Sequence, residues 1–167
     1  MFSATRIMRT SQIIYPPPPL GSSENSSMIS ASSYWDPGVA SRAFNGQTTG
    51  TLWWHLGSSQ KYPTSDGNAW LQLDFEDVYL ISSFQYVIIN RTTPNQQHWR
   101  DVVFKTSNSG LFGGEETVIG SYSFPNYYSP GSHSDVVYLV PTPSQFVRIE
   151  FHSTWDGYIA AQEVMFY

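Results

Sequence analysis

Residues 70–75 read Trp70-Leu71-Gln72-Leu73-Asp74-Phe75, and this stretch decides the fold class. Apolar and polar residues alternate in it, so an extended chain would place Leu71, Leu73 and Phe75 together on one face. An amphipathic helix would instead repeat its apolar residues at intervals of three and four positions. The stretch therefore predicts a β-strand with one buried face.

Six further short runs read as strands, each bounded by clusters of Gly, Pro, Asn or Ser. They cover residues 81–90, 102–107, 117–123, 135–140, 146–152 and 163–167. The only helical pattern is a single turn around 38–44. Many short strands separated by turn signals are typical of an antiparallel sandwich or barrel. Long loops are expected at 34–38, 45–69, 91–100, 108–116, 124–134 and 153–159, and such loops on a rigid sandwich usually recognise something.

The composition limits the function classes. The 167 residues suit one domain, with 13% charged and 16% aromatic side chains. Soluble proteins average about 25% charged residues. A net charge of −5 disfavours a binder of the phosphate backbone, which needs clustered Lys and Arg. The chain has no cysteine, which excludes disulfides, zinc–thiolate sites and cysteine nucleophiles. We expect no nucleic-acid partner.

Residues 1–27 differ in composition from the rest of the chain. Ile13, Ile14 and Tyr15 lead into four prolines, Pro16 to Pro19, and a Gly/Ser-rich stretch follows at 21–27. Consecutive prolines hold an extended conformation, and Gly and Ser make a flexible joint. We therefore expect a proline-rich arm and hinge over 1–27, which either docks on a neighbouring subunit or is a disordered tail. The compact domain is expected over 28–167.

The same N-terminal stretch bears on localisation. It contains no apolar run of seven or more residues before Pro16, so it predicts neither a signal peptide nor membrane insertion. We expect a virion or another extracellular assembly that is reached without classical secretion, or otherwise the cytoplasm.

The order of several segments carries a family resemblance. In chain order they are Ala31-Ser32-Ser33, Ala43-Phe44-Asn45-Gly46, Trp53-Trp54, Trp70 to Phe75, Ile81 through Asn90-Arg91, Val103 to Ser107, Phe146 to Ile149 and Gln162-Glu163-Val164. This order resembles the discoidin, or coagulation factor 5/8 type C, domain of the galactose-binding-like superfamily. That superfamily also holds family 32 carbohydrate-binding modules and F-type lectins. The resemblance implies an all-β, eight-stranded antiparallel jelly-roll β-sandwich whose loops at one end bind ligands.

The resemblance also implies a calcium site. In relatives that bind calcium, a turn and a glutamate near the C-terminus surround the ion with oxygen atoms. The matching positions here are Arg42, Asn45, Gln47, Thr51 and Glu163. Asn45 stands where the family commonly has Asp, which leaves Glu163 as the carboxylate of the set. The alternative is a metal-free turn in which Asn45 and Gly46 adopt positive φ angles and Glu163 accepts from nearby backbone donors.

A sugar site follows from the likeness to F-type lectins, which use one histidine and two arginines. His55, Arg91 and Arg100 occupy comparable places in this chain. A guanidinium group and an imidazole can donate to sugar hydroxyls, and an aromatic ring can cover the apolar face of a pyranose. The candidate rings are Tyr34, Trp35, Trp99 and Tyr158. The alternative for His55 alone is an ordinary loop histidine.

No catalytic motif is present: the sequence lacks a Gly-x-Ser-x-Gly elbow, His-Glu-x-x-His and a phosphate-binding loop. We expect a non-catalytic, lectin-like module that attaches a larger assembly to a galactose- or fucose-type glycan. The alternative is a structural virion component, such as a minor capsid or tail protein, whose arm 1–27 docks on neighbouring subunits. Both hypotheses predict an oligomer or an assembly subunit.

Overall fold

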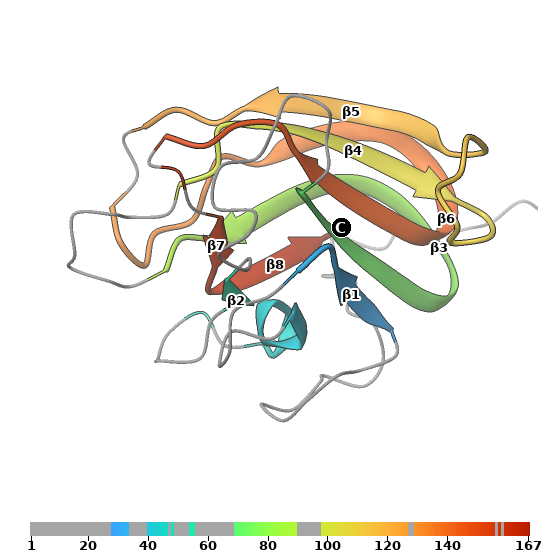
Figure 1. The fold of residues 1–167 in the computed structure, drawn as a ribbon, viewed down its shortest axis with the longest axis horizontal. Coiled ribbons are helices and arrows are strands. Elements are labelled where there is room, and N and C mark those ends of the chain that lie inside the picture. Colours follow the sequence, from blue (N-terminus) through green and yellow to red (C-terminus); the bar gives the residue numbers. More distant parts are fainter. Residues whose placement is uncertain are drawn as a thin grey trace, which may run out of the picture.

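The computed structural model describes residues 28–33, 40–46, 48, 54–55, 69–89, 98–126, 129–155, 157 and 159–167. Within these ranges it contains eight strands and one short 3-10 helix (Figure 1). The strands are β1 Ile29–Ala31, β2 Trp54–His55, β3 Ala69–Val87, β4 Asp101–Ser107, β5 Thr117–Ser123, β6 Val137–Phe151, β7 Ala160–Ala161 and β8 Glu163–Phe166, and the helix η1 is Ala40–Phe44. The predicted all-β class is confirmed, and so is the helical turn.

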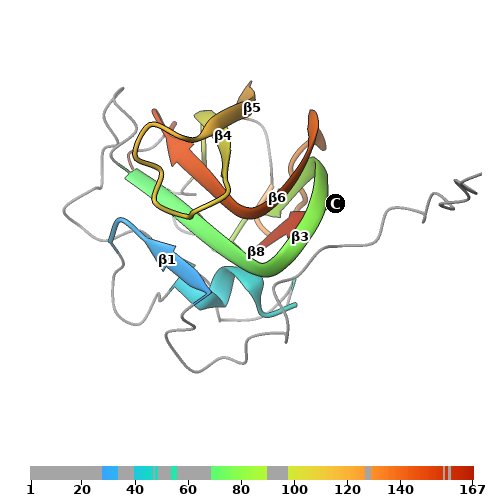
Figure 2. The ribbon, with the colours of Figure 1, turned by 90° about the vertical axis from the view of Figure 1, so that its right-hand side faces the viewer.

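Two long strands, β3 and β6, hold the fold together. Six strands form one strongly curved antiparallel sheet in the order β1-β3-β6-β4-β5, with β8 also paired to β3, while β2 and β7 form a separate pair. The first half of β3 and the second half of β6 lie with β1, β4 and β5, and their other halves lie with β8. Figure 2 shows both long strands bending through the fold. The two halves therefore supply the two layers of a β-sandwich.

The sequence predicted each long strand as two separate strands, which is wrong. Residues 70–75 and 81–87 belong to β3, and residues 137–140 and 146–151 belong to β6, so both predicted pairs of strands are each one strand. At the bend of β3 the carboxylate of Asp74 accepts from the N–H of Glu76 at 2.8 Å, and Glu76 has a φ of 59°. This local bond turns the chain, and pairing to β6 resumes at Tyr79.

The core between the layers is aromatic. The Phe84 ring centroid lies 4.8 Å from that of Phe104 in the opposite layer and 5.2 Å from that of Phe166. Phe75 and Leu71 are fully buried, as the alternation around them predicts. Burying one such side chain contributes roughly 1.5–3 kcal/mol. The rings of the alternating strands are therefore a central part of the core, together with aliphatic side chains such as Leu71 and Ile149.

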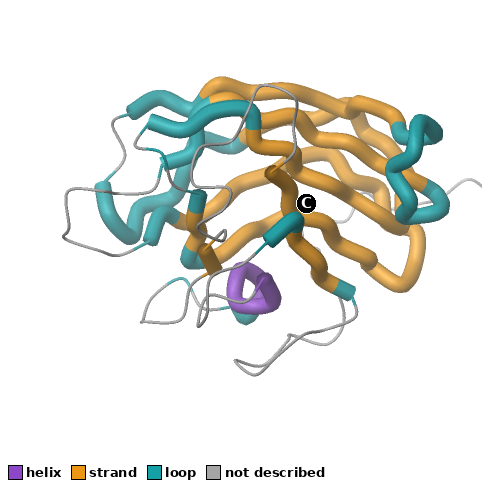
Figure 3. The backbone as a smooth tube through the Cα atoms, viewed as in Figure 1, coloured by secondary structure: helices purple, strands orange, loops and turns teal. Residues whose placement is uncertain are grey.

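Connections gather at the two ends of the strands (Figure 3). One end, which we call the loop end, contains the segments 98–100, 124–126, 129–134 and 152–155, together with the pair β2 and β7. The opposite end contains the bends of β3 and β6 and the β4–β5 connection, residues 108–116. Among the predicted loops, 108–116 therefore lies at one end, and the described parts of 91–100, 124–134 and 153–159 lie at the other.

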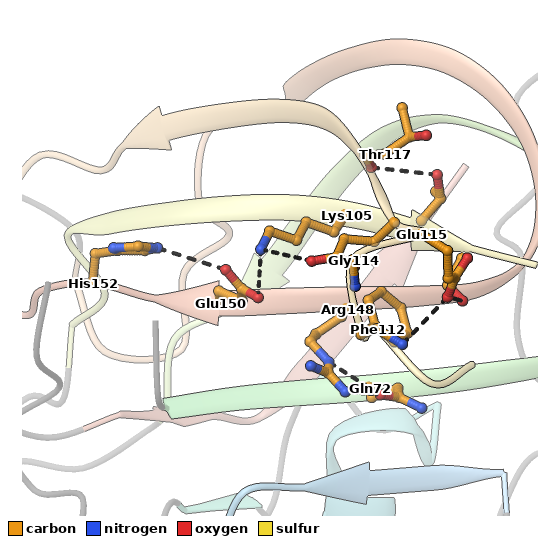
Figure 4. A network of polar contacts seen from close by, with 12 residues as sticks. Gln72, Lys105, Phe112, Gly114, Glu115, Thr117, Arg148, Glu150 and His152 are labelled. Atoms are coloured by element: carbon orange, nitrogen blue, oxygen red, sulfur yellow. Dashed lines mark hydrogen bonds and ion pairs between the residues drawn. The ribbon is translucent and has the colours of Figure 1, made fainter. Parts of the chain in front are cut away.

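The connection 108–116 folds over the outward face of the sheet and is held by Arg148 of β6. Its guanidinium carbon lies 4.4 Å from the Trp70 ring centroid and 4.1 Å from the Phe112 ring centroid. Its Nη2 donates to Gln72 Oε1 at 2.6 Å (Figure 4). Burial of this cation lowers the pKa of Arg148. The opposite end of the sandwich is therefore fixed by stacking between charged and aromatic groups.

Candidate functional site

Backbone hydrogen bonds join three connections at the loop end. The N–H of Arg100 donates to Ser153 O at 3.1 Å, and the N–H of Trp155 donates to His98 O at 3.2 Å. The N–H of Phe124 donates to Arg100 O at 2.8 Å. These bonds fix the positions from which the side chains of Arg100 and Trp155 project.

Arg100 and Trp155 form the central pair of the site. The guanidinium carbon of Arg100 lies 4.8 Å from the ring centroid of Trp155, within the range of a cation–π contact. The indole N–H of Trp155 donates to Phe124 O at 2.7 Å, which fixes the orientation of the ring. Trp155 remains 43% exposed and the Arg100 side chain 49%. An oriented aromatic surface and an accessible fork of donors therefore stand side by side.

Asp101 forms an ion pair with Arg100, one member of this pair. The hydroxyl of Ser123 donates to its Oδ1 at 2.6 Å, and the hydroxyl of Ser153 donates to its Oδ2. Those two hydrogen bonds, with a smaller contribution from the nearby Arg100, lower the pKa of Asp101 below its usual value. Arg100 Nε lies 3.5 Å from Asp101 Oδ2. An ionised carboxylate thus anchors the guanidinium beside Trp155.

Trp99 was predicted as a ligand-binding ring, and the structure corrects this. Its side chain is fully buried and stacks on Tyr86, with ring centroids 4.0 Å apart and an interplanar angle of 8°. Its indole N–H donates to Ala160 O at 2.9 Å. A ring with both its faces and its polar atom engaged in the core has nothing to offer a ligand.

Of the three residues predicted from F-type lectins, the structure describes Arg100 and the backbone of His55. The backbone of His55 pairs with Ala160 of β7, the residue whose carbonyl accepts from Trp99. The strand of His55 therefore lies at the loop end, as does Arg100. The remaining sugar candidates, Tyr34, Trp35, Arg91 and Tyr158, lie outside the described residues.

Trp155 itself was missed by the sequence analysis. It precedes Asp156-Gly157, a dipeptide typical of turns, and Gly157 has a φ of 81°. The N–H of Gly157 donates to the Thr154 hydroxyl at 2.7 Å. A large aromatic residue immediately before a turn dipeptide was the available signal, because such a ring is carried outward where the chain reverses.

The predicted calcium turn is closed by a hydrogen bond within the protein. The N–H of Gly46, whose φ is 74°, donates to Oε1 of the fully buried Glu163 at 3.2 Å. Arg42 lies in η1 and Asn45 directly follows that helix. Gln47 and Thr51 lie outside the described residues. The described parts of the chain contain no group of three His, Cys, Asp or Glu that could hold a metal.

That donor set alone does not fit a calcium ion, which takes six to eight oxygens with carboxylates supplying most of the charge. Glu163 is the one carboxylate predicted for the site, and it already accepts from Gly46. The positive φ of Gly46 and the accepting glutamate match the metal-free alternative, but its expectation of a positive φ at Asn45 was wrong. The calcium site stays a prediction.

A thermal melt tests the calcium prediction. Because Glu163 already closes the turn, we expect the midpoint to differ by less than about 1 °C between calcium and chelator. Replacing Glu163 with glutamine should lower the stability by about 1–3 kcal/mol in both buffers, since it alters a buried acceptor. A calcium-dependent rise in the midpoint that E163Q removes would establish the metal site instead.

The sequence matches no family model and no curated protein. Solved structures do match the fold. A family 32 carbohydrate-binding module of Clostridium perfringens in complex with galactose is 17% identical, with a TM-score of 0.63, over 83% of this chain and 90% of that chain. The fold is that of family 32 carbohydrate-binding modules. The resemblance to discoidin-like, galactose-binding-like domains is thereby confirmed for the fold.

Two further structures with the same fold contain bound sugars. A second family 32 module of Clostridium perfringens, in complex with GalNAc-β-1,3-galactose, is 16% identical with a TM-score of 0.63, over 83% of this chain and 93% of that chain. The lectin domain of lectinolysin, in complex with Lewis B antigen, is 14% identical with a TM-score of 0.60, over 83% and 90%. The fold is therefore one that carries sugar sites in other proteins.

One further observation concerns membranes. Among the residues that the structure describes, no helix is long and apolar enough to cross a bilayer.

Proposed function

We propose that this chain is a non-catalytic carbohydrate-binding module whose loop end binds a galactose- or fucose-type glycan. The observation that carries the proposal is the exposed, oriented ring of Trp155 with the guanidinium of Arg100 beside it. The sugar complexes of proteins with the same fold support it.

The side chains of Trp155 and Arg100 would make different contacts with the sugar. The Trp155 ring packs against the apolar C–H face of a pyranose, and its fixed orientation reduces the entropy lost on binding. Arg100 donates from its fork of N–H groups to ring hydroxyls, while Asp101 keeps that fork in place. The predicted ligand-binding residues His55, Arg91, Tyr34, Trp35 and Tyr158 would complete the site.

The low charge of the chain agrees with a neutral ligand. Only 13% of residues are charged, and at the loop end Arg100 is balanced by Asp101. A neutral sugar requires hydrogen bonds and apolar contact, which this site offers, whereas an anionic polymer requires unpaired cations. The proposal therefore names a neutral glycan and no nucleic acid.

The assembly hypothesis remains a prediction beside this proposal. The arm 1–27 lies outside the described residues, and the predictions of an oligomer, a virion component and an extracellular location rest on the sequence alone. Attachment of a larger assembly to glycans would combine both hypotheses.

A glycan array tests the proposed function. We expect the full chain to bind galactose- or fucose-terminated glycans and to give no signal on sulfated or sialylated polymers that lack them. Leu111→Ser, which removes an exposed apolar side chain at the opposite end, should bind as the wild type does. Silence of the folded chain across all neutral glycans on the array would overturn the proposal.

A further inference from the structure

An open hollow of about 390 Å³ lies along β4 and β5. Its lining residues are Asp101, Val102, Val103, Ser121, Tyr122, Ser123 and His152. Asp101 begins β4, Ser123 ends β5 and His152 directly follows β6, so all three stand where the strands reach the loop end. The hollow therefore adjoins the candidate site without containing Trp155.

The strand register determines which chemical groups face the hollow. Asp101 pairs with Ser123 and Val103 pairs with Ser121, whereas Val102 and Phe104 between them are buried. Alternation thus turns a carboxylate, two hydroxyls and one apolar side chain outward together. Ser121 is exposed. Groups that donate and accept around a small apolar floor suit a ligand with several hydroxyls.

An ion-pair network borders the hollow on the side away from the loop end (Figure 4). Lys105 Nζ lies 2.9 Å from Glu150 Oε1 and 3.6 Å from Glu116 Oε1, and His152 Nε2 lies 3.8 Å from Glu150 Oε2. The one lysine of this network is paired with two carboxylates, and Arg100 lies beside Asp101 at the other side, so each of these cations already has an acidic partner. The surroundings therefore favour a neutral ligand over an ionic one.

Arg100 connects the hollow to Trp155. Its Nε lies 3.5 Å from Oδ2 of Asp101, a lining residue, and its guanidinium carbon lies 4.8 Å from the Trp155 ring centroid. A single side chain thus touches the stacking ring on one side and the wall of the hollow on the other. A ligand that rests on Trp155 and extends past Arg100 would enter the hollow.

We propose that this hollow is a second subsite, which holds the next sugar unit of a glycan whose first unit stacks on Trp155. The inference rests on the proposed function and adds a ligand class: an oligosaccharide of at least two neutral units. The hydroxyls of the second unit bond with Ser121, Asp101 and His152, and its apolar face rests on Val103. The chain then binds a disaccharide more tightly than a monosaccharide.

Calorimetric titration with galactose and with GalNAc-β-1,3-galactose tests the subsite. We expect the wild-type chain to bind the disaccharide about tenfold more tightly. Ser121→Tyr fills the hollow, so it should reduce disaccharide affinity to that of galactose and leave galactose affinity unchanged. The matched control is Val118→Tyr, an exposed position on the same strand outside the hollow, which should keep the tenfold preference.

The outcomes separate this inference from the proposed function. Equal disaccharide affinity in S121Y and V118Y, with binding still lost in W155A, would overturn the subsite alone. Absence of binding to either probe would overturn the subsite, whereas the proposed function would be overturned only if the array were also silent across all neutral glycans. Because β5 is an edge strand, a tyrosine there should be tolerated, and Ser121→Gln serves as a smaller second variant if S121Y melts early.

Discussion

Replacing Trp155 with alanine should weaken glycan binding at least about thirtyfold, which corresponds to about 2 kcal/mol. The change removes the apolar surface on which the pyranose rests and also the partner that holds Arg100 in place. Calorimetric titration of wild type and variant with the glycan that gives the strongest array signal measures the loss.

The stability of the Trp155→Ala variant serves as the control for this experiment. Trp155 is 43% exposed, and its indole N–H donates to Phe124 O, so its removal should cost only about 1 kcal/mol of stability. A variant that melts near the wild-type temperature and still binds sugar with unchanged affinity would contradict the proposed site.

Replacing Trp99 with alanine should instead cause a large loss of stability. Removing a fully buried tryptophan from a packed core costs about 3–5 kcal/mol, because it leaves a cavity beside Tyr86 and an unpaired carbonyl at Ala160. For a domain of this size that loss lowers the melting midpoint by about 10 °C. Urea denaturation followed by circular dichroism measures it.

The milder variant Trp99→Phe separates stability from binding at this position. It retains a ring next to Tyr86 but removes the N–H that donates to Ala160, so we expect an intermediate loss of stability and an unchanged sugar affinity below the melting range. If W99F remained folded yet lost sugar binding, the assignment of Trp99 to the core alone would be wrong.

The strands were predictable because the alternation of apolar and polar residues within a short stretch of sequence indicates which side chains are buried. Leu71, Leu73 and Phe75 face the core in the way that their spacing predicts. The continuity of β3 and β6 was not predictable, because Glu76-Asp77 and Pro141-x-Pro143 have the composition of turns that end strands. Pairing across the bend depends on the partner strand, which lies far away in the sequence.

The candidate site, too, was predictable only in part from the sequence. Arg100 was predicted from a family resemblance, and it stands at the loop end beside an aromatic ring. The choice of ring was wrong, because Trp99 and Trp155 both lie within predicted loops and the contacts that bury Trp99 come from residues distant in the sequence. Trp99 is buried by Tyr86 and Ala160, which a local pattern does not record. The hollow on β4 and β5 likewise depends on register between strands.

The central claim is that the loop end binds a neutral sugar through Trp155, and NMR titration tests it most directly. Galactose and, separately, Lewis B antigen would be added to the ¹⁵N-labelled full chain while the six indole N–H signals are followed. We predict a saturable shift of the Trp155 indole signal and of the Arg100 amide, with the Trp99 indole unaffected. Saturable shifts confined to residues remote from the loop end, or no shift with either sugar, would contradict the account.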